Sequence, residues 1–269
     1  MGLFDIIDEI AEKQITKTET GDNRLLGVVT GIVAKNYDAD MPGRICVTIP
    51  VRDRDANELQ WARVAMPSSG TKWGHYFLPE VGDQVLLAFE QGNIEKPYVI
   101  GAIPKDSNTF LTKAVDEKNQ YKKIVTKNGN TILFEDNSEG EGDNDKIEII
   151  TAKEAHQIKL DNEKKRISIT DKSGNNSIVI KTEDGNMQIK AEKKLTIEVG
   201  SNVKLVMNEN GAVQLECSRL TVNADSSINL ESSGTMKMKG SNVQAEASSI
   251  LKMESSGAAM ISGSPIKMG

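Results

Sequence analysis

Acidic side chains cluster in the segment EDNSEGEGDNDK, which covers residues 135–146. Two pairs of carboxylates alternate with small residues there, Glu139 with Glu141 and Asp143 with Asp145. Alternating oxygen ligands of this kind are typical of calcium loops. The helix-flanked ligand pattern of such a loop is absent from the sequence, so we interpret the segment as a solvated acidic turn.

General-base chemistry depends on the two histidines of the chain, His75 and His156, which are 81 residues apart. A nucleophilic triad needs a histidine beside the nucleophile and an orienting partner, and neither histidine has a sequence context of that kind. Met238, Met253 and Met268 offer thioether sulfurs to soft metals, but methionine more often fills irregular cores. We therefore expect no enzyme activity, no metal and no cofactor.

Composition excludes several further classes of function. The chain of 269 residues has 33 basic and 39 acidic residues and a net charge of −6, which argues against binding to nucleic acid or to an anionic membrane. Cys46 and Cys217 lie far apart and suggest neither a disulfide framework nor a zinc site. No apolar run reaches the length of a membrane-spanning helix, and no secretion signal is recognisable.

The elements that would position any site begin with MGLFDIIDEIAEKQ at the N-terminus. Apolar residues alternate with acidic ones at helical spacing, so we expect residues 1–23 to hold a short amphipathic helix and a linker. Its acidic face makes an anionic membrane an improbable target. Docking on a neighbouring protein and packing on its own domain are equally consistent with the pattern.

Residues 24–105 have the pattern of a small β-barrel. Short apolar runs such as RLLGVVTGIVAK, GRICVTIP and DQVLLAFEQG are separated by the turn signals DADMPG, PSSG and EVGD. Closure into a barrel removes exposed strand edges, and an OB-fold is our preferred architecture. Its aromatic residues could stack on single-stranded nucleic acid, but nine basic and nine acidic residues in this range exclude a basic groove.

The chain beyond residue 121 consists of two-residue apolar alternations separated by polar turns. From Ile147 to Met187 the units start 11, 9, 11 and 9 residues apart, which favours an antiparallel meander over residues 121–194. From Leu220 onward they start 7 or 8 residues apart. Such a unit is too short to coil around a core, so either one chain uses several units per coil or three chains wind together over residues 195–269.

The motifs of the barrel resemble those of the central spike proteins of contractile injection machines, a family that includes VgrG proteins, phage baseplate assembly protein V and the cell-puncturing spikes of phage tails. The resemblance is carried by WG-x-x-FLP, by VGDQVLLAFEQG and by P-x-V-x-G, which place the following residues: Trp73, Gly74, Phe77, Leu78, Pro79, Pro97, Val99 and Gly101. The stretches NGNTILFEDN and AHQIKLDN are similar to the first strands of the family's β-prism.

This resemblance implies an all-β homotrimer. Three OB barrels at 24–105 would form a collar, residues 106–120 a linker, residues 121–194 an antiparallel β-prism, and residues 195–269 a three-stranded intertwined β-helix needle. The side chains expected in the trimer core of the needle are Ile228, Leu230, Met236, Met238, Val243, Leu251, Met253, Ile261, Ile266 and Met268.

Departures from the family define the expected partners. Only about 23 residues precede the barrel, so a separate baseplate hub protein is expected to contact Leu3, Phe4, Ile7 and Ile10 and to connect the spike with the tail tube. No lysozyme domain separates barrel from needle, and no His-x-His iron motif follows His156. We expect a PAAR-type tip protein to cap the final residues, Ser264, Pro265, Ile266, Lys267, Met268 and Gly269.

The function expected from this resemblance is structural and non-enzymatic. The spike would be made in the bacterial cytoplasm, assembled into the baseplate of a contractile tail or tail-like particle, and pushed through the target cell envelope on sheath contraction. The alternative is a β-solenoid carbohydrate-active enzyme or a surface adhesin. That alternative requires a cleft with convergent charged groups, and the repeats after residue 240 contain very few charges.

Overall fold

The computed structural model describes residues 24–49, 60–105 and 109–267. The predicted N-terminal helix at 1–23 and the last two residues lie outside these ranges. The chain divides into two compact units between Lys193 and Lys194. Strands are the main regular elements of both units, so the prediction of an all-β protein is confirmed. None of the helices in the described ranges is long and apolar enough to cross a membrane.

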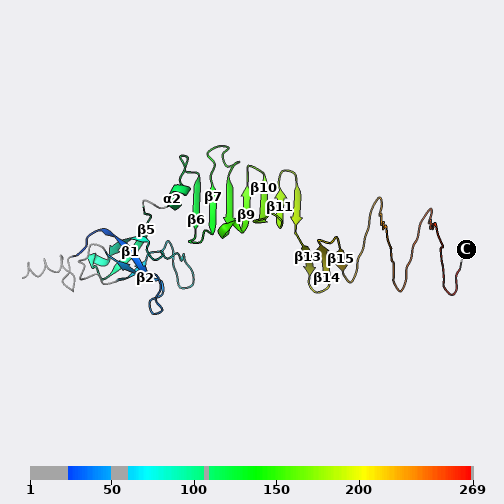
Figure 1. The fold of residues 1–269 in the computed structure, drawn as a ribbon, viewed down its shortest axis with the longest axis horizontal. Coiled ribbons are helices and arrows are strands. Elements are labelled where there is room, and N and C mark those ends of the chain that lie inside the picture. The colour runs from blue at the N-terminus through cyan, green and yellow to red at the C-terminus, as the bar shows by residue number, and fades with distance from the viewer. Residues whose placement is uncertain (1–23, 50–59, 106–108, 268–269) are drawn as a thin grey trace, which may run out of the picture. The chain divides into compact units, whose positions relative to one another are not determined.

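The first strands close into the five-stranded barrel drawn in blue and cyan in Figure 1. They are β1 (Val28–Lys35), β2 (Arg44–Thr48), β3 (Gln60–Val64), β4 (Gln84–Phe89) and β5 (Pro97–Ile103). The closed order is β1-β2-β3-β5-β4, with β3 and β5 parallel and every other pair antiparallel. This closure confirms the predicted OB-type barrel.

The barrel contains the main apolar core of the described chain. Alternate residues of a strand point to opposite faces, so every second side chain along a barrel strand points into the barrel. The inward side chains are largely shielded from solvent. The largest fully buried side chains are Val33, Ile45, Cys46, Val47, Val85, Leu87 and Val99. The buried apolar side chains of the barrel thus form a core that includes no residue of the repeats that follow.

Gly31 of β1 leaves room for this core. A Cβ built on Gly31 would lie 2.7 Å from Leu87 Cδ1 and 3.2 Å from the carbonyl oxygen of Thr48. We expect Gly31→Val to lower the free energy of unfolding of the barrel by about 1–3 kcal/mol, because Leu87 is fully buried and has nowhere to move. Denaturant unfolding followed by tryptophan fluorescence measures this, since both tryptophans precede residue 74.

Gly101→Val is the matched control for that substitution. Gly101 lies in β5, and a Cβ built there meets no atom within 4 Å. The control should leave barrel stability unchanged or slightly raised, because β-branched residues favour strands. Equal losses of stability in the two variants would contradict the close approach of Leu87 to Gly31.

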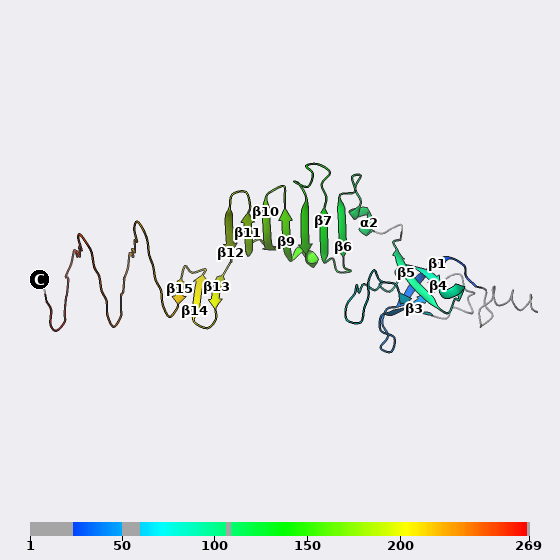
Figure 2. The same cartoon turned by 180° about the vertical axis from the view of Figure 1, so that it is seen from behind.

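Seven strands of the first unit form a single-layered antiparallel sheet. They are β6 (Tyr121–Val125), β7 (Thr131–Glu135), β8 (Lys146–Ile150), β9 (His156–Asp161), β10 (Arg166–Asp171), β11 (Ser177–Lys181) and β12 (Asn186–Lys190). Each strand pairs with its neighbours in sequence, as in a meander. Figures 1 and 2 show the sheet from opposite sides.

Short helical segments connect the strands. The 3-10 turns η2 (Glu90–Gly92) and η3 (Ala152–Glu154) follow β4 and β8, and α2 (Thr109–Ala114) precedes β6. Helix α2 thus falls within the segment 106–120 that we expected to be a plain linker. Its six residues bury no side chain fully.

The second unit begins with a three-stranded antiparallel sheet of β13 (Lys194–Val199), β14 (Val203–Asn208) and β15 (Val213–Glu216). Antiparallel pairing therefore extends to Glu216, beyond residue 194, where we expected it to end. Tight turns with positive φ at Gly200 and Gly211 permit these hairpins. After Glu216 the described chain has no assigned strand and runs back and forth in broad zigzags (Figure 1).

Candidate assembly surface

One face of the seven-stranded sheet carries an isoleucine at the same level of every strand. Cross-strand register places these residues directly opposite one another from β6 to β12. We call them the isoleucine row: Ile124, Ile132, Ile149, Ile158, Ile169, Ile178 and Ile189. A second row lies two residues away on the same face and contains Phe134, Ile147, Leu160, Ile167, Ile180 and Met187.

This apolar face is open to solvent in the single chain. Side chains of the isoleucine row are 37–49% exposed, and Met187 at the end of the second row is 63% exposed. Soluble proteins rarely leave so large a continuous apolar surface uncovered unless it is an interaction site. At about 25 cal/mol per Å² of buried apolar area, covering these thirteen side chains supplies a strong driving force for association.

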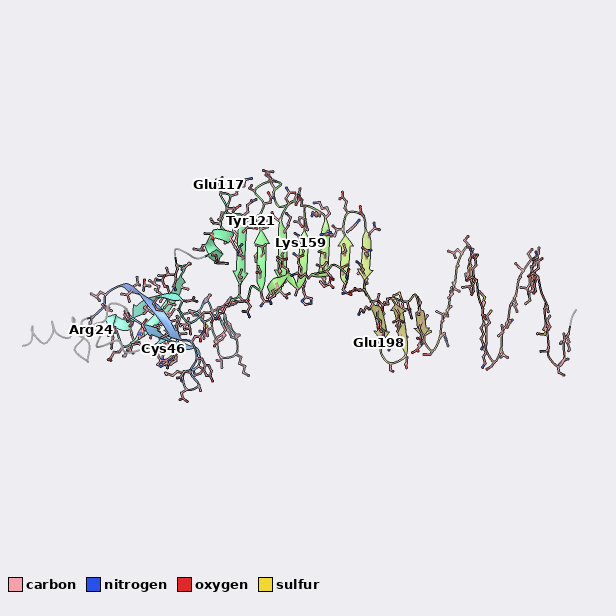
Figure 3. The ribbon with its side chains drawn as sticks, in the orientation of Figure 1. Arg24, Cys46, Glu117, Tyr121, Lys159 and Glu198 are labelled. Carbon is pink, nitrogen blue, oxygen red and sulfur yellow. The ribbon has the colours of Figure 1, made fainter. Side chains whose placement is uncertain are left out.

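The opposite face of the sheet carries networks of ion pairs. Lys159 Nζ lies 2.6 Å from Glu148 Oε1 and 3.6 Å from Asp161 Oδ2, and Gln157 donates to Glu148 Oε2 at 2.8 Å. Glu148 and Asp161 are both buried. Figure 3 labels Lys159 within this sheet.

A second charged group on this face surrounds Lys146, which lies 3.0 Å from Glu163 Oε2 and 3.2 Å from Glu135 Oε1. The hydrogen bond to Glu163 raises the pKa of Lys146 most, and burial opposes that rise only in part. Lys146 therefore stays charged and is paired within the sheet, whereas Asp161 Oδ2 and Arg166 Nε on the same face are buried without a hydrogen-bond partner. The contrast between the two faces identifies the apolar face as the one that demands a covering surface.

Asp171, at the turn between β10 and β11, is expected to make the stability of the fold depend on pH at low pH. Hydrogen bonds from the Asn176 side chain, followed by those from Ser173, lower the pKa of Asp171 from 3.8 to about 2. A depressed carboxyl pKa stabilises the fold above pH 3.8, and that contribution is lost as the pH falls toward 2. We expect Asn176→Ala to raise the pKa of Asp171 more than Ser173→Ala does, as measured by NMR titration of its carboxyl carbon. Equal effects would contradict the dominant role of Asn176.

Residues that could do chemistry are not brought together. His75 Nδ1 lies 2.9 Å from Ser68 Oγ within one exposed loop, and His156 contacts Thr151, so the two histidines belong to different elements. In the described ranges no three His, Cys, Asp or Glu side chains are grouped as metal ligands. The acidic segment is a loop between β7 and β8 in which Asp145 Oδ1 accepts a hydrogen bond from the backbone N–H of Asn137.

One large hollow of about 1180 Å³ contains two carboxylates, those of Glu80 and Asp83. Both have local structural roles. Glu80 Oε2 lies 2.9 Å from Lys127 Nζ, and Asp83 Oδ2 accepts the backbone N–H of Glu80 at 2.8 Å. They therefore do not form the free acid pair that a glycoside-cleaving site requires.

The predicted needle residues that the structure describes are solvent-exposed in the single chain. From Ile228 to Ile266 the predicted core side chains are 49–86% exposed. The trimer core that we expect for them remains a prediction about an assembly of chains. The predicted hub contacts Leu3, Phe4, Ile7 and Ile10, and the tip residues Met268 and Gly269, lie outside the described residues.

Two members of the isoleucine row were not identified from the repeat pattern in the sequence. Ile124 and Ile132 lie in the short runs KKIV and TILF, which precede the regularly spaced units that begin at Ile147. Neither run alternates between apolar and polar residues, and the long loop between β7 and β8 breaks the spacing that would have linked them to the others.

A known protein family matches the chain over the barrel. Residues 29–103 match the family model of the type VI secretion system/phage-baseplate injector OB domain. The type VI secretion system spike protein VgrG2a of Pseudomonas aeruginosa is 29% identical over 91 residues, which cover 32% of this chain and 11% of the relative. VgrG5 of the same species is 33% identical over 92 residues, which cover 32% of this chain and 12% of the relative.

A longer match extends beyond the barrel. The type VI secretion system spike protein VgrG3 of Vibrio cholerae is 27% identical over 127 residues, which cover 46% of this chain and 12% of the relative. The chain thus spans about a tenth of the length of these curated relatives. The predicted resemblance to spike proteins of contractile injection machines is confirmed.

Proposed function

On the premise that residues 29–103 form an injector OB domain, we propose that the protein is the trimeric, non-enzymatic spike at the centre of a contractile tail baseplate. The observation that carries the proposal is the order of the barrel and the sheet along the chain. An injector barrel is followed by a sheet whose entire apolar face lacks a cover in the single chain. Three copies would cover that face with one another.

Three sheets arranged around an axis form a closed prism in which the isoleucine rows meet. Each sheet then has its apolar face inside and the Lys146 and Lys159 ion pairs outside, where water screens them. The exposed alternating residues after Glu216 would continue the same threefold core as an intertwined needle. A single chain cannot bury them, because its described residues beyond 216 form no sheet of their own.

Such a shaft suits mechanical work. Backbone hydrogen bonds between stacked strands run along its length at about 4.8 Å per strand, and opening one chain would require its neighbours to open as well. In this proposal, sheath contraction pushes the shaft through the target cell envelope. The barrels join a hub protein at one end, and a PAAR-type protein caps the tip at the other.

The particle that contains the protein provides the test. We expect affinity purification of the tagged, full-length chain from its native host to recover a contractile tail or tail-like particle, with a hub protein and a tip protein present in fixed proportion. Recovery of the chain on the cell surface, without sheath or tube proteins, would contradict the spike and support an adhesin.

A further inference from the structure

Two arginines face each other on the outer surface of the barrel. Arg44 of β2 and Arg63 of β3 are direct cross-strand partners in the register of the two strands. Like charges directly opposite one another destabilise a sheet unless an anion lies between or beside them. No carboxylate in the described ranges lies within ion-pair distance of either guanidinium.

The arginine pair opens onto a hollow of about 310 Å³, which we call the arginine pocket. Its walls come from β2, β3, β5 and the η2 loop, and they include Arg44, Trp61, Arg63, Glu90, Lys96 and Tyr98. Trp61 and Tyr98 are half-buried and supply apolar, planar walls. A guanidinium fork beside an aromatic face is well suited to binding a carboxylate.

The acidic groups at the pocket do not neutralise the arginines. Glu90 is engaged elsewhere, since its Oε1 lies 3.6 Å from Lys96 Nζ and its Oε2 accepts the Tyr98 hydroxyl at 2.9 Å. The Glu95 side chain is at the exposed rim. Lys35 of β1 adds a further positive charge on the same side, because it pairs with Cys46, which in turn pairs with Trp61. Figure 3 labels Cys46 on the barrel.

The described chain starts at Arg24, beside the loop that lines this pocket. The N–H of Leu25 donates to the Gly92 carbonyl at 2.9 Å, and Arg24 Nη1 donates to the Gln91 carbonyl at 2.7 Å. These contacts hold the start of the described chain against η2, the loop that supplies Glu90 to the pocket. Residues 1–23 therefore join the barrel next to the arginine pocket.

Charge and length make this N-terminal segment a suitable occupant. It contains six carboxylates and two lysines, and Asp5, Asp8, Glu9 and Glu12 fall on one face if the segment is helical. Residues 13–23 could span up to about 36 Å when extended, at roughly 3.3 Å per residue, which is ample for the acidic face to turn back onto the barrel.

We propose that the arginine pocket binds the acidic face of residues 5–12 of the same chain. Carboxylates of this face approach Arg44 and Arg63, and the like-charge conflict between the two strands is relieved. The apolar residues Leu3, Ile7 and Ile10 lie on the other face of the helix and then point away from the barrel. The pocket thus presents them to a neighbouring protein, such as the hub in the proposed function.

Hydrogen exchange of the N-terminal amides in the full-length protein tests this docking. In Arg44→Glu/Arg63→Glu the amides of residues 5–12 should exchange about tenfold faster than in the unmodified protein, because the docked state is lost. Adding Asp5→Lys/Asp8→Lys to that variant should restore protection. Lys72→Glu/Lys105→Glu is the matched control, since it reverses two exposed charges away from the pocket and should change nothing.

Three results would overturn the docking: N-terminal amides without protection in the unmodified protein, equal protection after the arginine reversal, or no restoration by the lysine changes. Arg44→Gln/Arg63→Gln removes the charges without adding like ones, and it replaces the first variant if tryptophan fluorescence shows that the barrel has unfolded. Protection that depends on protein concentration would assign the docking to a second copy and contradict the same-chain proposal. We expect trimer formation to be unaffected in every variant, because none of the substituted residues lies on the apolar face of the sheet, so failure of this inference is distinct from failure of the proposed spike.

Discussion

Ile178→Asp/Ile189→Asp is expected to yield monomers instead of trimers. The two residues are direct cross-strand partners within the isoleucine row. In a trimer the double change places six carboxylates in two neighbouring layers of the apolar core. Burying an unpaired charge costs several kcal/mol even after relaxation, so six of them exceed the roughly 5–15 kcal/mol by which folded proteins are typically stable. Analytical ultracentrifugation measures the outcome.

The matched control places the same two charges on the other face of the same strands. Ser177 and Gln188 lie next to Ile178 and Ile189 in sequence, and their side chains belong to the polar face. Ser177→Asp/Gln188→Asp should sediment as the unmodified protein does. Identical behaviour of the two double variants, whether both trimeric or both monomeric, would contradict an assembly that uses only the apolar face.

Ending the chain at Lys193 is expected to abolish resistance of the trimer to heat and detergent while leaving folded barrels. The second unit has almost no core in the single chain: Val206 is its only buried apolar side chain among the described residues. In the proposed trimer, the apolar side chains of this unit would be covered by neighbouring chains. Removal of residues 194–269 takes away the interlocked part of the assembly, whereas the barrel core of Ile45, Leu87 and Val99 is untouched.

Gel electrophoresis with and without boiling measures that resistance, and tryptophan fluorescence reports whether the barrel remains folded. A chain that ends at Ser264 serves as control, because it loses only the final residues and keeps every earlier repeat. It should retain resistance close to that of the whole chain. Undiminished resistance of the Lys193 truncation would refute an intertwined needle.

Short-range patterns predicted much of the fold. The barrel followed from its turn signals and motifs, and the alternating spacings of 11 and 9 have a simple geometric origin. Residues that pair across a tight antiparallel turn are symmetric about it, so Ile147 pairs with Leu160 while Ile149 pairs with Ile158. The sequence thus specified which face of each strand is apolar, from Ile147 onward.

The pairing register of strands that are not joined by a tight turn could not be predicted from the sequence in the same way. The opposition of Arg44 and Arg63 depends on how β2 and β3 pair across an intervening segment, and no local pattern determines that alignment. The balanced count of nine basic and nine acidic residues also concealed the local concentration of positive charge, because a sum carries no position. Similarly, the hairpins from β13 to β15 extended antiparallel pairing past the expected boundary, since their turns resemble those of the preceding sheet.

The native mass of the full-length protein tests the central claim most directly. Light scattering coupled to size exclusion should give three times the chain mass of 29.3 kDa, and the value should not change on dilution, because the apolar faces and needle repeats of three chains cover one another. A stable monomer of 29.3 kDa with its sheet intact would contradict the trimeric spike.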